Sequence, residues 1–197
     1  MILIFDYGAG NLFSLKCSVE KFYPNVKVVN KLEEKFDGLI LPGVGNFDPA
    51  MRSIRKYKKV IDEAIRSDIP ILGICLGMEM LFNKSQEGKL KGLSILDGEV
   101  VMLPKSKVKI PHMGWNNLKI DKSSKLLKGL KDNSWFYFVH SYRVKPKDKS
   151  IIVGEAEYGI KVPAVIEDRY LFGTQFHPEK SGDNGEVILK NFVELIE

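Results

Sequence analysis

Cys75 has the sequence surroundings of a catalytic nucleophile. It stands in the run Gly73-Ile74-Cys75-Leu76-Gly77, directly after the apolar residues 69–72. A strand, a tight turn between glycines and a helix beginning near Met78 together predict a nucleophile elbow, which pushes the side chain into a cleft. We expect the start of that helix to stabilise a thiolate. A lone cysteine is more often a small buried hydrophobic residue, so its neighbours must decide between the two interpretations.

A nucleophilic thiol needs a base, and His177 is the best candidate among the three histidines. It lies in Gln175-Phe176-His177-Pro178-Glu179, after an apolar run, and Pro178 disfavours a helix at the histidine. In an extended segment residues i and i+2 point the same way, so Glu179 can reach the imidazole and orient it. Cys75, His177 and Glu179 would then form a triad. Alone, His177 is better explained as a hydrogen-bonded histidine at a strand end, and His140 is the second choice as base.

Acyl transfer also needs hydrogen-bond donors for the oxyanion that develops on the substrate. The backbone N–H of Leu76, at the expected helix start, is one candidate. The loop Pro42-Gly43-Val44-Gly45 can supply another, because glycines on both sides of Val44 allow a peptide plane to turn toward the cleft. Taken alone, this loop is better explained as a connecting turn.

These residues need a sheet that brings them together. In the first half, apolar runs predict strands at 1–5, 26–29, 37–41 and 70–74, with helices at 12–22 and 49–66. This alternation predicts an α/β fold with a parallel, doubly wound sheet. Beyond about residue 92 short strands dominate, at 100–103, 117–120, 135–139, 151–153, 162–166 and 170–176, and a helix follows at 185–196. We expect a single domain over residues 1–197.

Ligands of such sheets lie at the carboxyl ends of the strands. The segments 6–11 and 42–47 and Cys75 each follow a predicted strand of the first half. One cleft could therefore gather all three.

Composition narrows the possible partners. The chain of 197 residues has a net charge of +5, but its lysines are scattered and no arginine-rich stripe indicates a nucleic-acid groove. No apolar run is long enough to span a membrane, and the start Met1-Ile2-Leu3-Ile4-Phe5-Asp6 reads as a strand, not as a signal peptide.

Two cysteines, Cys17 and Cys75, fit a reducing cytoplasm. The histidines and cysteines lack metal-ligand spacing, so we expect neither a metal nor another cofactor.

Several motifs together resemble one family. The Gly-x-Cys-x-Gly run, the Pro-Gly-Val-Gly loop and the His-Pro-Glu run are similar to class I (triad) glutamine amidotransferases. The chain also resembles the glutaminase subunits of imidazole glycerol phosphate synthases. The residues that carry this narrower likeness are Asp6 to Leu12, Pro42 to Gly45, Pro111 to Asn116, His140 to Arg143 and His177 to Ser181.

The resemblance implies a flavodoxin-like central sheet, mostly parallel and flanked by helices. It also implies hydrolysis of L-glutamine to glutamate and ammonia through a thioester on Cys75. The ammonia would pass to a (βα)₈-barrel cyclase subunit, the partner in a heterodimer of L-histidine biosynthesis. By position, the substrate-binding residues would be Gly45, Glu79, Glu87, Ser141 and Tyr142. The partner interface would include Asn11, His112, Met113 and Trp115.

Two positions depart from the family. Asn46 stands where the loop more often has alanine, and we expect little consequence from it; Glu79 stands where the family usually has glutamine. An ionised carboxylate accepts hydrogen bonds but cannot donate one as an amide does. Two alternatives stay open at this point. One is the amidotransferase component of another pathway, such as anthranilate or aminodeoxychorismate synthesis. The other is a non-catalytic binding module on the same fold.

Overall fold

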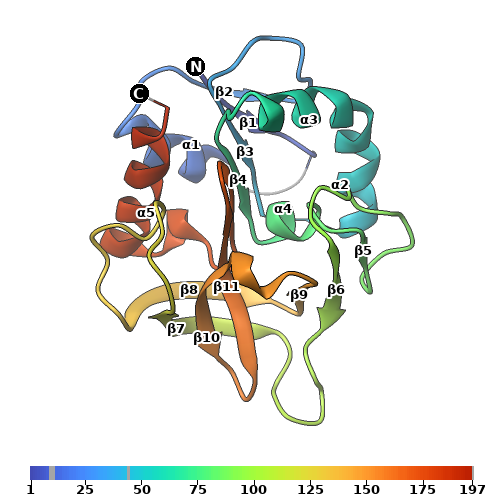
Figure 1. The fold of residues 1–197 in the computed structure, drawn as a ribbon, viewed down its shortest axis with the longest axis vertical. Helices are drawn as coiled ribbons and strands as arrows, with labels where there is room; N and C mark the ends of the chain where they lie inside the picture. The colour runs from blue at the N-terminus through green and yellow to red at the C-terminus, as the bar shows by residue number, and fades with distance from the viewer. Residues whose placement is uncertain (9–11, 44, 197) are drawn as a thin grey trace.

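Strands and helices alternate in the first half of the chain, and strands dominate the second half (Figure 1). A computed structural model describes residues 1–8, 12–43 and 45–196. Its strands are β1 (Ile2–Phe5), β2 (Val26–Val29), β3 (Gly38–Leu41), β4 (Ile71–Ile74), β5 (Lys84–Ser85), β6 (Gly98–Met102), β7 (His112–Ile120), β8 (Ser134–His140), β9 (Tyr142–Pro146), β10 (Ile152–Glu157), β11 (Lys161–Asp168) and β12 (Leu171–Thr174). Its α-helices are α1 (Leu12–Glu20), α2 (Phe47–Ile54), α3 (Lys58–Arg66), α4 (Leu76–Glu79) and α5 (Gly182–Glu194), and its 3₁₀ turns are η1 (Arg55–Tyr57), η2 (Lys149–Ile151) and η3 (Pro178–Lys180).

The main sheet joins the two halves of the chain. In the described residues its strand order is β2-β1-β3-β4-β12-β11-β10-β7-β8, and a smaller sheet has the order β5-β6-β9. The pairs from β2 to β12 are parallel, and those from β12 to β8 are antiparallel. The expected α/β fold with a strand-rich second half is confirmed. The site depends on one pairing, in which Thr174 of β12 lies in register with Ile74 of β4.

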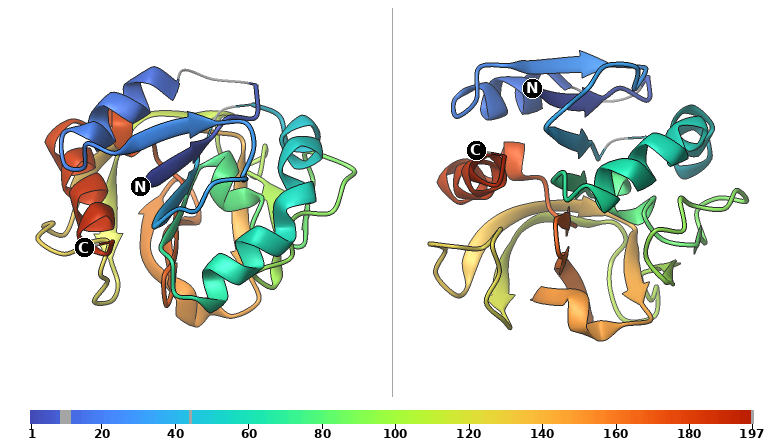
Figure 2. Two further views of the ribbon diagram at one scale, coloured as in Figure 1. Left: turned by 90° about the horizontal axis from the view of Figure 1, so that it is seen from above. Right: turned by 45° about the horizontal axis from the view of Figure 1, so that its top comes forward.

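Apolar side chains fill both faces of the parallel half. One core packs side chains of α2 and α3 against the sheet, and the other packs side chains of α1 and α5. Figure 2 shows α1 and α5 together on one side, away from α2 and α3. Because β1, β3, β4 and β12 are buried along their whole length, they read as continuous apolar runs. Within the described residues, no helix combines the length and apolar character of a membrane span.

Several predicted bounds are wrong. The single helix expected at 49–66 starts at Phe47 and is divided by η1, a break that apolar spacing does not reveal. The helix expected from Met78 to Phe82 is the single turn α4, because residues 76–82 are all buried and leave no polar face for a longer surface helix. Strand β7 begins at residue 112, five residues earlier than expected, and the strands β5 and β9 were not predicted.

Helix α5 is tied to the segment after β7 by a buried amide. The Asn191 side chain is 7% exposed, and its Nδ2 donates to the carbonyls of Leu126 and Lys128, each at 2.8 Å. Replacing Asn191 with Ala leaves both carbonyls without this donor, so we expect a loss of about 1–3 kcal/mol in the free energy of unfolding. Urea denaturation measures it. The control is Asn184→Ala on the same helix, which removes one exposed bond to Trp135. Equal effects of the two substitutions would contradict this account.

Candidate active site

Cys75 lies in a strained turn between β4 and α4. Its backbone has φ 49° and ψ −104°, a combination that residues with a side chain rarely adopt. The strain falls on the cysteine and not, as we expected, on the glycines beside it. Gly77 serves close packing, because a Cβ at this position would lie 1.9 Å from the carbonyl oxygen of Leu41 on β3. The turn is therefore pressed against the sheet, and the cysteine is 6% exposed.

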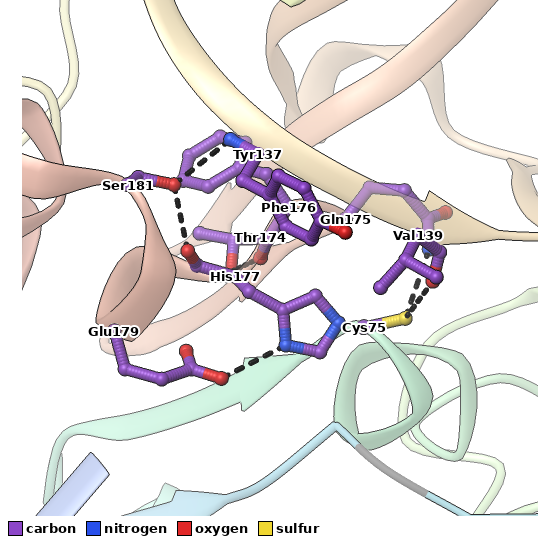
Figure 3. Close-up of polar contacts among 9 residues, drawn as sticks. All are labelled: Cys75, Tyr137, Val139, Thr174, Gln175, Phe176, His177, Glu179 and Ser181. Carbon is purple, nitrogen blue, oxygen red and sulfur yellow. Dashed lines mark hydrogen bonds and ion pairs between the residues drawn. The ribbon is translucent and has the colours of Figure 1, made fainter. Parts of the chain in front are cut away.

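His177 and Glu179 form a buried pair beside Cys75. The His177 Nδ1 lies 2.9 Å from Glu179 Oε1, and the two side chains are 1% and 7% exposed. Because a carboxylate accepts, Nδ1 carries a proton in this contact, and in the neutral ring the lone pair then lies on Nε2. No hydrogen-bond partner is recorded for Nε2 among the described residues. Figure 3 shows the imidazole between the Glu179 carboxylate and the Cys75 sulfur, with Nε2 on the sulfur side.

Hydrogen bonds to β8 fix the position of His177. Its backbone N–H donates to the Tyr137 carbonyl at 3.0 Å. The Ser181 hydroxyl donates to the His177 carbonyl at 2.6 Å and accepts from the Tyr137 N–H at 3.0 Å (Figure 3). These contacts hold the segment after β12 against β8, so the ring has a defined place relative to Cys75.

The surroundings of the thiol favour its neutral form. Burial raises the pKa of the Cys75 thiol well above its ordinary value. The Glu79 carboxyl, which is ionised at the high pH where such a thiol would titrate, adds to the rise. The Gln175 amide, whose Nε2 lies 3.7 Å from Sγ, and the Leu76 N–H act in the opposite direction. The start of the following helix does favour a thiolate through the Leu76 N–H, but the expected net stabilisation of a thiolate is wrong, because burial outweighs this contact. Helix α4 is a single turn, and its dipole does not overcome burial.

A cleft of about 430 Å³ opens above the sulfur. Its volume suits a small polar ligand. The predicted substrate-binding residues all line it, together with Leu76, Cys75 and His177; they are Gly45, Glu79, Glu87, Ser141 and Tyr142. Two predictions lie outside the described residues: the oxyanion donor Val44 and the interface residue Asn11.

Glu79 is neutral in this site near pH 7. Its carboxyl is 4% exposed and lies one turn after Cys75, with its Oε1 3.2 Å from the Gln175 Nε2. Burial raises the pKa of Glu79 to about 8, the amide of Gln175 opposes this rise, and the charge of Glu87 adds to it. A protonated carboxyl can donate a hydrogen bond. Protonated Glu79 therefore keeps a hydrogen-bond donor where the family usually has glutamine. The ionised carboxylate considered from the sequence could not donate.

The three predicted interface residues that the structure describes lie in β7 and differ in exposure. Met113 and Trp115 are 63% and 54% exposed. The His112 side chain is 3% exposed and stacks on Phe138, so it offers no surface contact in this chain.

His112 belongs instead to a buried chain of hydrogen bonds. His140 Nδ1 donates to the Tyr142 carbonyl at 2.7 Å, His112 Nδ1 lies 3.0 Å from His140 Nε2, and Asn116 Nδ2 lies 3.3 Å from His112 Nε2. Burial lowers the pKa of His140 to about 3 and that of His112 to about 4, so both rings are neutral. With both nitrogens engaged, His140 is not available as the alternative base.

Sequence reasoning did not assign Gln175, which touches both Cys75 and Glu79 and is fully buried. The signal for it was a polar residue inside the apolar run before His177. Val139 and Lys180, which line the cleft, were not assigned either. Among the described residues, no group of three or more His, Cys, Asp or Glu side chains is arranged to hold a metal ion.

Comparisons with known proteins show the family of the chain. The family described as glutamine amidotransferase class-I matches residues 3–195. The imidazole glycerol phosphate synthase subunit HisH of Methanocaldococcus jannaschii is 50% identical, with all of both chains covered. The subunit of that name from Caldanaerobacter subterraneus subsp. tengcongensis is 48% identical, covering 100% of this chain and 98% of its own.

Solved structures show the same fold at low identity. The glutaminase domain of CTPS from Trypanosoma brucei has a TM-score of 0.74 at 17% identity and covers 99% of this chain and 92% of its own. The structure of PurLQS from Thermotoga maritima contains a chain with a TM-score of 0.77 at 16% identity, covering 100% and 98%. These likenesses concern the fold alone.

Replacing Glu79 with Gln should change how stability depends on pH. The Glu79 pKa is about 8 in the folded chain, against an ordinary 4.5. Between these values the unfolded chain binds fewer protons, so the wild-type free energy of unfolding should fall, relative to the variant, from about pH 5 to about pH 8. Urea denaturation at several pH values measures this difference. The exposed Glu63→Gln controls for loss of one carboxyl. Parallel curves for wild type and Glu79→Gln would show that Glu79 is ionised.

Proposed function

The chain belongs to the class I glutamine amidotransferase family, and we propose that it is the glutaminase subunit of an imidazole glycerol phosphate synthase in histidine biosynthesis. The observation that carries the reaction is the placement in one cleft of a strained cysteine and of His177, whose ring is held from behind by the buried Glu179 carboxyl. The pathway is supported by full-length relatives of that name. Their names favour it over anthranilate or aminodeoxychorismate synthesis.

The first half of the reaction forms a thioester. His177 Nε2 takes the Cys75 thiol proton, and the sulfur attacks the side-chain amide carbon of glutamine. The resulting oxyanion would accept from the Leu76 N–H and from the Val44 region. The carbon–nitrogen bond then breaks, His177 returns the proton to the leaving nitrogen, and ammonia departs. Glu179 remains a carboxylate and stabilises the imidazolium that forms between the two transfers.

The second half hydrolyses the thioester. His177 takes a proton from water, whose oxygen attacks the acyl carbon, and the carbon–sulfur bond breaks. The sulfur recovers a proton from His177, and glutamate leaves. Because the thiol is neutral at rest, we infer that proton transfer accompanies attack.

One charged and several neutral polar groups of the cleft would select glutamine. The Glu87 carboxylate, half-buried at the cleft, suits the substrate ammonium. Neutral Glu79 would donate to a substrate oxygen, while Gly45, Ser141 and Tyr142 complete the wall around the amino-acid end. These assignments rest on family position and on the shared cleft.

The partner would be the (βα)₈-barrel cyclase, which receives the ammonia. Exposed Met113 and Trp115 on β7 support a docking face there, and Asn11 is proposed from family position alone. We also propose a cytoplasmic location, supported by two free cysteines, and one domain over residues 1–197, supported by a family match over 3–195 and a sheet that joins both halves.

Replacing Cys75 with Ser should abolish glutamine hydrolysis, because a hydroxyl is a far weaker nucleophile in a site built for sulfur. A rate loss of at least about 10³-fold is expected in the assembled synthase, measured as glutamate formation. A glutamine-mimicking electrophile should modify Cys75, with peptide mass spectrometry locating the adduct. Cys17→Ser is the matched control and should keep full activity. Activity that survives Cys75→Ser, or an adduct on Cys17, would overturn the mechanism and leave a non-catalytic module as the alternative.

A further inference from the structure

The loop that carries Glu87 lies against the start of helix α2. The Glu87 N–H donates to the Ser85 hydroxyl at 3.1 Å, at the end of β5. A hydrogen bond from the Phe47 N–H to the Glu87 carboxyl lowers the pKa of that carboxyl, against the rise from burial. Glu87 is therefore attached at the backbone to its own loop and at the side chain to α2.

Asp48 attaches the rest of the Glu87 loop to helix α2. Its Oδ1 accepts from the N–H of Lys89 and of Leu90, each at 3.0 Å, and its Oδ2 lies 3.2 Å from the Lys89 nitrogen. Because these backbone donors lower the pKa of Asp48, its carboxylate is ionised near neutral pH. The Asp48 carboxylate thus holds Lys89 and Leu90, the two residues that follow Gly88.

The Glu87 loop lies so close to Asp48 and Phe47 that a side chain at Gly88 has no room. A Cβ there would lie 2.1 Å from Asp48 Oδ1 and 2.9 Å from Phe47 Cδ1. The loop can approach the carboxylate because this position is glycine. Helix α2 begins two residues after Gly45, so the same contact ties the Glu87 loop to Gly45, which lines the cleft with Cys75.

We propose that Asp48 is a positioning residue for glutamine binding, which holds the loop 87–90 on α2 so that Glu87 faces the cleft. This inference rests on the proposed function, in which Glu87 binds the substrate ammonium. An acid near a helix start also interacts favourably with the helix dipole, and that role alone would affect stability without affecting substrate binding. The two roles predict different kinetics.

The first test compares Asp48→Ala with wild type in the assembled synthase. We expect the KM for glutamine to rise roughly tenfold while kcat changes less than about twofold, because ground-state binding is lost. Asp48→Asn keeps one acceptor oxygen and should give a smaller rise. The control is Asp62→Ala, which removes an aspartate paired with Lys58 on α3. An unchanged KM in Asp48→Ala, with wild type active, would overturn the inference and leave the proposed function intact.

Two combinations test whether Asp48 acts through the Glu87 loop. In a Glu87→Gln background, Asp48→Ala should add almost nothing to KM; additive effects would contradict the proposal. Gly88→Ala should raise KM when it is made in the wild type. Its effect should be smaller when Asp48 is also replaced by Ala, because the added Cβ then no longer collides with the Asp48 carboxylate.

Hydrogen–deuterium exchange supplies a readout independent of catalysis. Asp48→Ala should speed exchange of the amides in residues 87–90, and Asp62→Ala should not. Unchanged exchange would overturn the inference. A wild type that hydrolyses no glutamine, with the exchange result as expected, would count against the proposed function alone.

Discussion

The parallel pairing of β4 with β12 is the contact on which the site depends. It aligns Ile74 with Thr174, so Cys75 and Gln175 leave neighbouring strands at one edge and His177 follows two residues later. A hydrogen bond from the Cys75 N–H to the Thr174 carbonyl, at 2.6 Å, closes this junction. Without this pairing, the nucleophile and its base would be two unrelated segments about a hundred residues apart in the chain.

Burial at that edge of the sheet explains why several ionisable side chains at the cleft are neutral. The Cys75 sulfur, Glu79 and His140 are shielded from water, as is His112 beside His140, and the neutral form of each is favoured. A neutral thiol is less reactive toward other compounds, and His177 stands ready to remove its proton once a substrate amide is in place. Neutral Glu79 avoids placing a second negative charge next to the sulfur when the thiolate forms.

Local chemistry could be predicted from the sequence, but long-range packing could not. Gly-x-Cys-x-Gly and His-Pro-Glu indicated the nucleophile and the oriented base because each depends on residues within five positions. Glu79 is buried against Gln175, and the loop that follows Glu87 is anchored on Asp48. Both are contacts between distant segments that no periodicity encodes. The burial of His112 was missed for the same reason, since its stacking partners Phe138 and Tyr158 come from β8 and the segment after β10.

The central claim is that Cys75 generates the ammonia used by a synthase partner. The direct measurement is product formation by the synthase assembled with the Cys75→Ala variant, supplied either with glutamine or with an ammonium salt. The account predicts that ammonium supports synthesis at the wild-type rate and that glutamine supports none. Glutamine-dependent synthesis by this variant, or loss of the ammonium-dependent rate in a complex that still assembles, would contradict it.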